Sequence, residues 1–141
     1  MRKLGVFVAV SALLITGCSA SDTAQWHPNN DLHYATYHAS SDDAKFDSAW
    51  SGKLVRIGNC VGVEENGWYL IEIPDSYELV TNDSGQFALR HGSEVYPFDR
   101  EYTGGGVLRE NLDKLAGHPE LQKCAADHAV AGSILIYTIE K

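Results

Sequence analysis

Few side chains in this sequence are placed for nucleophilic or acid–base chemistry. Hydrolysis through a covalent intermediate needs a serine or cysteine beside a histidine that a carboxylate orients. Ser84 lies in a turn-like stretch, Asp83-Ser84-Gly85, and the sequence contains no Gly-x-Ser-x-Gly elbow. His91 precedes Gly92-Ser93, a composition typical of a hairpin tip. We therefore assign no catalytic residue; a hydrolase would need His91 or His128 beside a carboxylate in a cleft.

The candidate binding surface combines acidic and aromatic side chains near Asn66-Gly67. Adjacent carboxylates point to opposite faces of an extended chain, so Glu64 and Glu65 do not form a catalytic pair. We interpret them as hairpin charges. The residues that we assign to this surface are Glu64, Glu65, Trp68 and His91.

A patch of histidines and aromatic residues runs from Trp26 to Trp50. A metal or partner site built from His27, His33 and His38 is one interpretation. Their spacing suits neither one helical face nor one strand face, so they would converge only through an irregular loop. We favour the simpler interpretation that some of the aromatic rings pack on a domain, and we predict no metal and no cofactor.

The start of the chain has the pattern of an export signal. Met1-Arg2-Lys3 is positively charged, and an apolar run from Leu4 to Ile15 precedes small residues. The run is shorter than the roughly 20 apolar residues that a membrane-spanning helix needs. We therefore expect a signal peptide that is removed.

Ile15-Thr16-Gly17-Cys18 resembles the lipobox of bacterial lipoproteins, and the resemblance covers only the signal region. It implies cleavage before Cys18, removal of residues 1–17, and a thioether-linked diacylglycerol on Cys18, often with an amide-linked acyl chain such as palmitate. Several acyl chains, at about 0.8 kcal/mol per buried methylene, make a stable anchor. The implied location is the cell envelope, at the outer membrane if the host has one and otherwise at the outer face of the cell membrane.

With Cys18 assigned to lipid, Cys60 and Cys124 remain as a pair, which in an oxidising compartment predicts a disulfide. The bond would close a loop of about 65 residues, worth roughly 4 kcal/mol in the chain-entropy account. A metal site is the alternative, because Cys124 and His128 are spaced i, i+4 and His118 lies near.

Composition limits the partners of the chain. The formal net charge is −8 for all 141 residues and becomes −10 without the signal, which carries Arg2 and Lys3. An acidic chain lacks the positive surface that nucleic acids and anionic lipids require, so we predict no nucleic-acid partner. The expected partners are the membrane, through the lipid, and an envelope or extracellular protein.

Two regions follow the signal. Residues 18–49 are polar and show no sustained hydrophobic period, so we predict a lipidated N-terminus and a flexible tether. Residues 50–141 are predicted to form a small disulfide-linked, β-rich domain, with Trp50 closing one end of its core.

Short apolar runs separated by turn residues predict an antiparallel β domain. We expect a first strand over Leu54–Val63, bent at Gly58 or Gly62, and a hairpin at Asn66-Gly67 that leads into Trp68–Ile73. A third strand is predicted from Tyr77 to Thr81. A further hairpin joins 86–90 to 94–98, where Pro97 favours an edge position.

The C-terminal third predicts a helical excursion before a last strand. Gly104-Gly105-Gly106 should break the chain, and Leu108, Leu112 and Leu115 have the spacing of a short amphipathic helix. Pro119 should begin a second helix, and the run from Ile134 to Ile139 a strand buried on both faces. The predicted fold class is α+β, mainly antiparallel β, as a small barrel resembling the OB fold; an open sheet with helices on one face is the alternative.

The combined pattern favours a membrane-anchored envelope lipoprotein with a non-enzymatic binding or structural role. Two alternatives stay open. An inhibitor of a host or competitor enzyme would use the loop from Glu64 to Trp68, and a minor envelope hydrolase would use one of the histidines named above.

Overall fold

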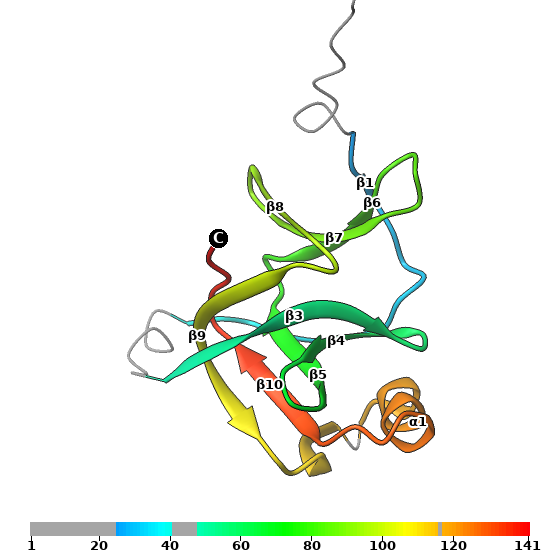
Figure 1. Ribbon diagram of the computed structural model, residues 1–141, viewed down its shortest axis with the longest axis vertical. Helices are drawn as coiled ribbons and strands as arrows, with labels where there is room; N and C mark the ends of the chain where they lie inside the picture. Colours follow the sequence, from blue (N-terminus) through cyan, green and yellow to red (C-terminus); the bar gives the residue numbers. More distant parts are fainter. Residues whose placement is uncertain (1–24, 41–47, 116) are drawn as a thin grey trace, which may run out of the picture.

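A computed structural model describes residues 25–40, 48–115 and 117–141 and contains two sheets (Figure 1). The larger sheet is formed by β2 (Ala35–Tyr37), β3 (Ala49–Ile57), β4 (Cys60–Glu64), β5 (Trp68–Pro74), β9 (Glu101–Arg109) and β10 (Gly132–Ile136). The smaller sheet is formed by β1 (His27–Pro28), β6 (Glu78–Thr81), β7 (Phe87–His91) and β8 (Glu94–Pro97). The 3-10 helix η2 (Asp113–Leu115) and the α-helix α1 (Pro119–Asp127) separate β9 from β10.

The last strand closes the larger sheet into a barrel. β10 pairs antiparallel with β9 and parallel with β5, and the order β10-β9-β3-β4-β5 thereby returns to β10. All five residues of β10 are buried, as the run of β-branched residues predicts. The fold is therefore mixed β, mostly antiparallel, with a closed five-stranded barrel and a short helix, which confirms the prediction of a small barrel.

The hairpins of the central region follow their turn residues. Asn66 has a φ of 51°, and the Glu65 N–H donates to the Gly67 carbonyl at 2.9 Å, so Asn-Gly forms the predicted turn between β4 and β5. The predicted third strand appears as β6. The predicted hairpin of β7 and β8 is also present, with Pro97 on the edge strand of the smaller sheet.

The single bent strand predicted over Leu54–Val63 is wrong. Gly58 has a φ of 57°, a left-handed conformation that lets the chain reverse, so β3 and β4 form a hairpin around Gly58 and Asn59. Glycine permits a bend and a turn equally, and only the pairing partner decides which forms.

The glycine-rich stretch is part of a strand, and the predicted helix over Leu108, Leu112 and Leu115 is wrong. Residues 104–106 lie inside β9, where a Cβ added at Gly104 would meet the Thr138 carbonyl oxygen at 1.9 Å. At Gly106 an added Cβ would approach the Leu135 carbonyl oxygen at 2.5 Å. The glycines therefore allow close contact between neighbouring segments, a role that sequence spacing did not show.

Trp50 lies against these glycines and is buried, as predicted. Its indole N–H donates to the Thr138 carbonyl at 3.0 Å, which joins β3 to the segment that follows β10. The ring belongs to the main core, which also contains buried side chains of both sheets, among them Leu79, Leu89 and Ile136. The two sheets therefore share one core.

The assignment of all of residues 18–49 to a flexible tether is wrong for the described residues 25–40. β1 pairs with β6 of the smaller sheet, and β2 pairs in parallel with β5 of the barrel. Leu32 lies between these strands and is 3% exposed. A single buried leucine and a few main-chain pairings produce no hydrophobic period in the sequence, so the predicted start of the domain at residue 50 was too late. The domain begins before Trp50.

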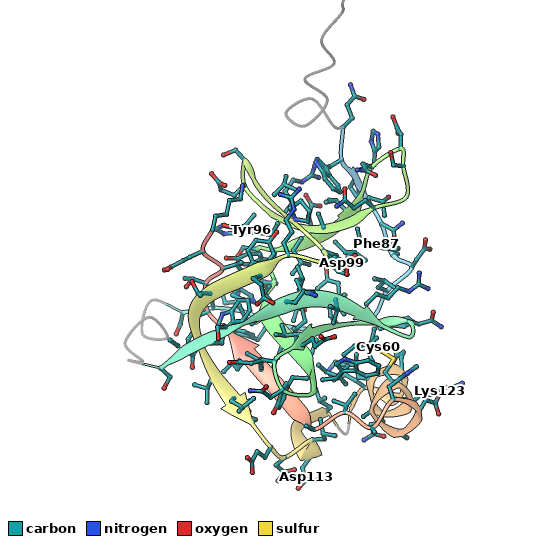
Figure 2. The ribbon with its side chains drawn as sticks, viewed as in Figure 1. Cys60, Phe87, Tyr96, Asp99, Asp113 and Lys123 are labelled. Atoms are coloured by element: carbon teal, nitrogen blue, oxygen red, sulfur yellow. A yellow bond between two sulfur atoms is a disulfide. The ribbon has the colours of Figure 1, made fainter. Side chains whose placement is uncertain are left out.

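The predicted disulfide is present. Cys60, at the start of β4, bonds to Cys124 of α1 with a Cα–Cα distance of 6.3 Å (Figure 2). The pair belongs to a second cluster of buried residues with Leu115 and Leu121, so the bond fastens α1, which begins at Pro119 as predicted, to the outside of the barrel.

The predicted signal peptide and Cys18 lie outside the described residues. Within residues 25–40, 48–115 and 117–141, no helix has the length and apolar character needed to cross a membrane.

The N-terminal segment should contribute to stability through Leu32. Leu32→Ala should lower the free energy of unfolding by about 2–5 kcal/mol, because it leaves a cavity in the core. Leu108→Ala is the matched control, since Leu108 is 51% exposed. Chemical denaturation measures both; equal, small losses would show that residues 25–40 do not stabilise the domain.

Candidate functional site

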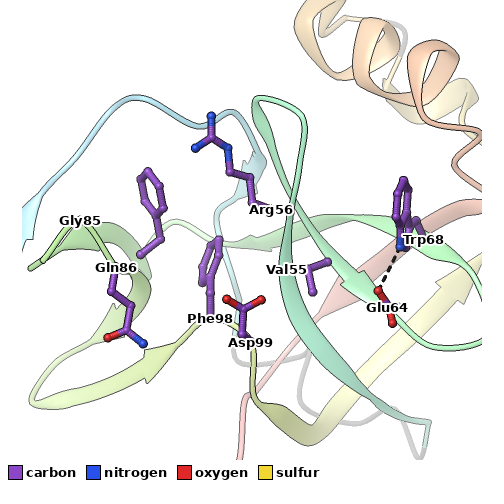
Figure 3. A pocket seen from close by; sticks show the side chains of 9 residues that line it. Val55, Arg56, Glu64, Trp68, Gly85, Gln86, Phe98 and Asp99 are labelled. Carbon is purple, nitrogen blue, oxygen red and sulfur yellow. Dashed lines mark hydrogen bonds between the residues drawn. The ribbon is translucent and has the colours of Figure 1, made fainter. Parts of the chain in front are cut away.

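A cleft of about 360 Å³ lies between the barrel and the smaller sheet (Figure 3). β3 and the β4–β5 hairpin contribute one wall. The start of β7 and the connection from β8 to β9 contribute the other. The lining residues are Val55, Arg56, Glu64, Trp68, Gly85, Gln86, Phe87, Phe98 and Asp99.

The cleft exists because β9 separates from β3 partway along it. Their strand pairing ends at Lys53 opposite Glu101. Two further bonds follow, in which the Leu54 N–H donates to the Arg100 carbonyl at 3.2 Å and the Asp99 N–H donates to the Leu54 carbonyl at 2.7 Å. The chain on the Asp99 side then runs into β8, and the rest of β3 has no strand beside it on this side among the described residues.

Arg56 forms a fixed cationic rim. Its Nε donates to the Gly58 carbonyl at 2.8 Å, and its guanidinium carbon lies 5.7 Å from the centre of the Phe87 ring. Phe87 in turn packs on Phe98, with ring centres 5.9 Å apart. The guanidinium is therefore held by the β3–β4 turn and by an aromatic pair.

Trp68 supplies an exposed aromatic face. The ring is 39% exposed, and its Nε1–H donates to the Glu64 carboxylate at 3.2 Å, as the dashed line in Figure 3 shows. The edge of the ring also meets His128, with ring centres 6.1 Å apart. These contacts orient the indole while leaving part of it available to a ligand.

Asp99 carries an exposed charge at the cleft. Its φ is 63°, a left-handed conformation that is uncommon for residues other than glycine. Figure 3 shows its carboxylate pointing into the cleft between Phe98 and Val55. In the part of the chain that the structure describes, this carboxylate makes neither a hydrogen bond nor an ion pair.

A hydrogen bond from Tyr102 holds the loop that carries Asp99. The Tyr102 hydroxyl donates to the Pro97 carbonyl at 2.7 Å. Burial raises the pKa of this phenol from its ordinary 10.0 to about 12. The same cause raises the pKa of the neighbouring Tyr96, whose ring packs edge-on against Tyr102.

The structure brings together two of the four residues assigned to the binding surface. Glu64 and Trp68 meet in the cleft. Glu65 points the other way and accepts a hydrogen bond from Ser51 at 2.9 Å. His91 lies at the far end of β7 and stacks on Tyr77, with ring centres 4.4 Å apart, so it does not belong to this site.

Sequence reasoning missed Arg56, Phe87 and Asp99. They come from three separate elements, and only the crossing of the β8–β9 connection over β3 brings them together. The one local signal was the end of an edge strand at Pro97, which precedes Phe98 and Asp99.

His27, His33 and His38 do not converge on one site. His27 lies 3.8 Å from Asp83, and His38 lies 3.3 Å from Asp75, both pairs at the surface. His33 forms an isolated bridge to Cys60. Among the described residues, no group of three or more potential ligands is placed to hold a metal ion. Ser84 has the predicted turn role, since its N–H donates to Asn82.

Comparison with protein-family models found no match, and neither the curated proteins nor the solved structures gave one.

Alkaline pH should destabilise the loop that carries Asp99. The folded protein holds the Tyr102 proton more tightly than the unfolded chain, so this contribution to stability is intact below pH 10 and is lost as the pH rises from 10 to about 12. Tyr102→Phe should lose less stability over that interval, although at neutral pH it should cost about 1 kcal/mol through the lost hydrogen bond.

Denaturation curves at neutral pH and between pH 10 and 12 measure both effects. Tyr69→Phe is the control at neutral pH, because no hydrogen bond of its hydroxyl occurs within the described residues. A Tyr102→Phe variant with the wild-type alkaline dependence would contradict the assignment.

Proposed function

We propose that this chain is an envelope lipoprotein, anchored through Cys18, whose cleft binds a partner without catalysis. The observation that carries the binding role is the combination of the half-exposed Trp68 ring with the unpaired Asp99 carboxylate in one cleft. The exposed part of the indole and the unpaired charge are both free to provide binding energy to a complementary ligand.

The anchor rests on the export signal and the lipobox resemblance of residues 1–18. Gln25, the first described residue, follows Cys18 by seven positions. An extended chain spans at most about 3.6 Å per residue, so the domain would lie within about 25 Å of the lipid. We therefore propose a domain held close to the membrane surface.

We further propose that the barrel is OB-like. Counting only barrel strands, the order around the barrel is first, second, third, fifth, fourth, and the third and fifth strands run parallel. This arrangement supports a five-stranded Greek-key barrel of that kind. The smaller sheet is then an insertion between the third and fourth strands, and α1 an insertion before the fifth.

The cleft favours binding over the hydrolase alternative. The described residues that line it include two carboxylates, a guanidinium and an amide, but neither His91 nor His128. Each of these polar groups can exchange hydrogen bonds with a ligand, and the aromatic rings supply apolar contact.

Lipidation is tested by Cys18→Ala with metabolic labelling by a palmitate analogue. The variant should lose the label, because the thiol that accepts the lipid is missing. It should also keep its signal peptide, because the peptide is cleaved only after the lipid is attached. The Cys60→Ala/Cys124→Ala double variant is the control; it loses the disulfide and should keep the label. Label retained by Cys18→Ala would refute the anchor.

Binding at the cleft is tested by photo-crosslinking in intact cells. A photoreactive residue in place of Gln86 should give a discrete adduct, because Gln86 lies at the cleft. The same residue in place of the exposed Glu110, beyond the other end of the barrel, is the control. Adducts at both positions, or adducts at position 86 that persist in Trp68→Ala, would contradict a role for the cleft.

A further inference from the structure

We infer that the cleft binds an extended, basic peptide segment that lies along the free part of β3 and places a lysine or arginine against Asp99. The inference rests on the proposed binding function and names the chemistry of the partner. Three features of the cleft carry it: a strand edge, a negative charge and an aromatic wall.

The strand edge is the main chain of Arg56. Leu54 directs its N–H and carbonyl away from β4, toward Arg100 and Asp99. Alternate residues of a strand direct their main-chain groups to the same side, so those of Arg56 point into the space that β9 has left. No hydrogen bond of these two groups occurs within the described residues. Such an edge recruits an extended chain as an added strand.

The charge of the cleft selects the side chain. Arg56 keeps its positive charge, because the groups that it contacts, the Gly58 carbonyl, Asn59 and the Phe87 ring, are uncharged. Glu64 accepts the indole N–H and keeps a negative charge, and Asp99 is unpaired. Two carboxylates and one guanidinium therefore leave the lining with a net negative formal charge, within a chain whose formal net charge is −8. An ammonium or guanidinium group complements Asp99, whereas an acidic segment would be repelled.

The aromatic wall accommodates the rest of such a side chain. Trp68 and Phe98 lie on opposite sides of Asp99 in Figure 3, and Phe87 packs on Phe98. Aromatic faces attract cations, and they also pack against the methylene groups of lysine and arginine. A volume of about 360 Å³ is sufficient for a short stretch of peptide and too small for a folded domain.

Fluorescein-labelled hexalysine tests the inference, with labelled hexaglutamate as the opposite charge, on the full chain purified in mild detergent. Fluorescence anisotropy should show saturable binding of hexalysine alone. Asp99→Asn should weaken this binding about tenfold, because a charge-assisted hydrogen bond is lost. Asparagine tolerates the left-handed conformation, so the variant should fold. Asp83→Asn, the same charge change at an exposed turn, should leave the affinity unchanged.

The strand edge is tested separately at Arg56. Arg56→Ala and Arg56→Pro both remove the side chain, but only proline removes the N–H that would pair with the peptide. An edge strand tolerates proline where its N–H is free, so Arg56→Pro should keep a cooperative unfolding transition and should bind hexalysine several-fold more weakly than Arg56→Ala.

Three results would overturn the inference: no saturable hexalysine binding, equal binding of hexaglutamate, or equal weakening by Asp83→Asn and Asp99→Asn. Equal affinities of Arg56→Ala and Arg56→Pro would overturn the strand-addition geometry. Crosslinks from position 86 without hexalysine binding would leave the proposed function standing and reject only this partner chemistry.

Discussion

The closure of the barrel by β10 is the constraint on which the rest of the structure depends. Residues Gly132–Ile136 are buried throughout, and their main-chain groups are paired on one side with β9 and on the other with β5. Where the strands of a closed barrel are paired on both sides, the connections between them leave at its ends. The excursion from β5 to β9 forms the smaller sheet at one end. That from β9 to β10 forms η2 and α1, which the Cys60–Cys124 bond fastens to the wall.

The two ends of β9 have different roles. β9 must pair with β3 over its first half and with β10 over its second, and it changes partner at Gly104–Gly106. Trp50 fills the space above these glycines, which a side chain would otherwise occupy. β9 begins at Glu101, opposite Lys53, and the chain before it belongs to β8 and its connection, so the rest of β3 faces the smaller sheet across a gap. The binding surface is thus a consequence of where the pairing of β9 with β3 begins.

Local chemistry made part of this fold predictable. Asn66-Gly67 specifies its own turn, Pro97 its edge position and Pro119 the first turn of α1. With Cys18 assigned to lipid, the other two cysteines allow one pairing. The predictions were wrong where a residue's role depends on contacts with segments that are distant in the sequence. Gly104 is needed because of the Thr138 carbonyl, and Leu32 is buried by strands far along the sequence. Glu64 and Trp68 could be grouped because one hairpin holds them, whereas Asp99 joins them only through the tertiary fold.

Asp99 shows how a site differs from the framework that holds it. A left-handed backbone at a residue other than glycine opposes stability, and the surrounding bonds from Leu54 and Tyr102 maintain the loop regardless. An unusual backbone conformation in a cleft is a reason to look for a ligand whose binding offsets its energetic cost. A cationic group there would satisfy the carboxylate, and a strand laid along Arg56 would satisfy the nearby main chain. A single extended ligand would then pair with both features of the cleft, which is why a peptide accounts for the site better than an isolated ion.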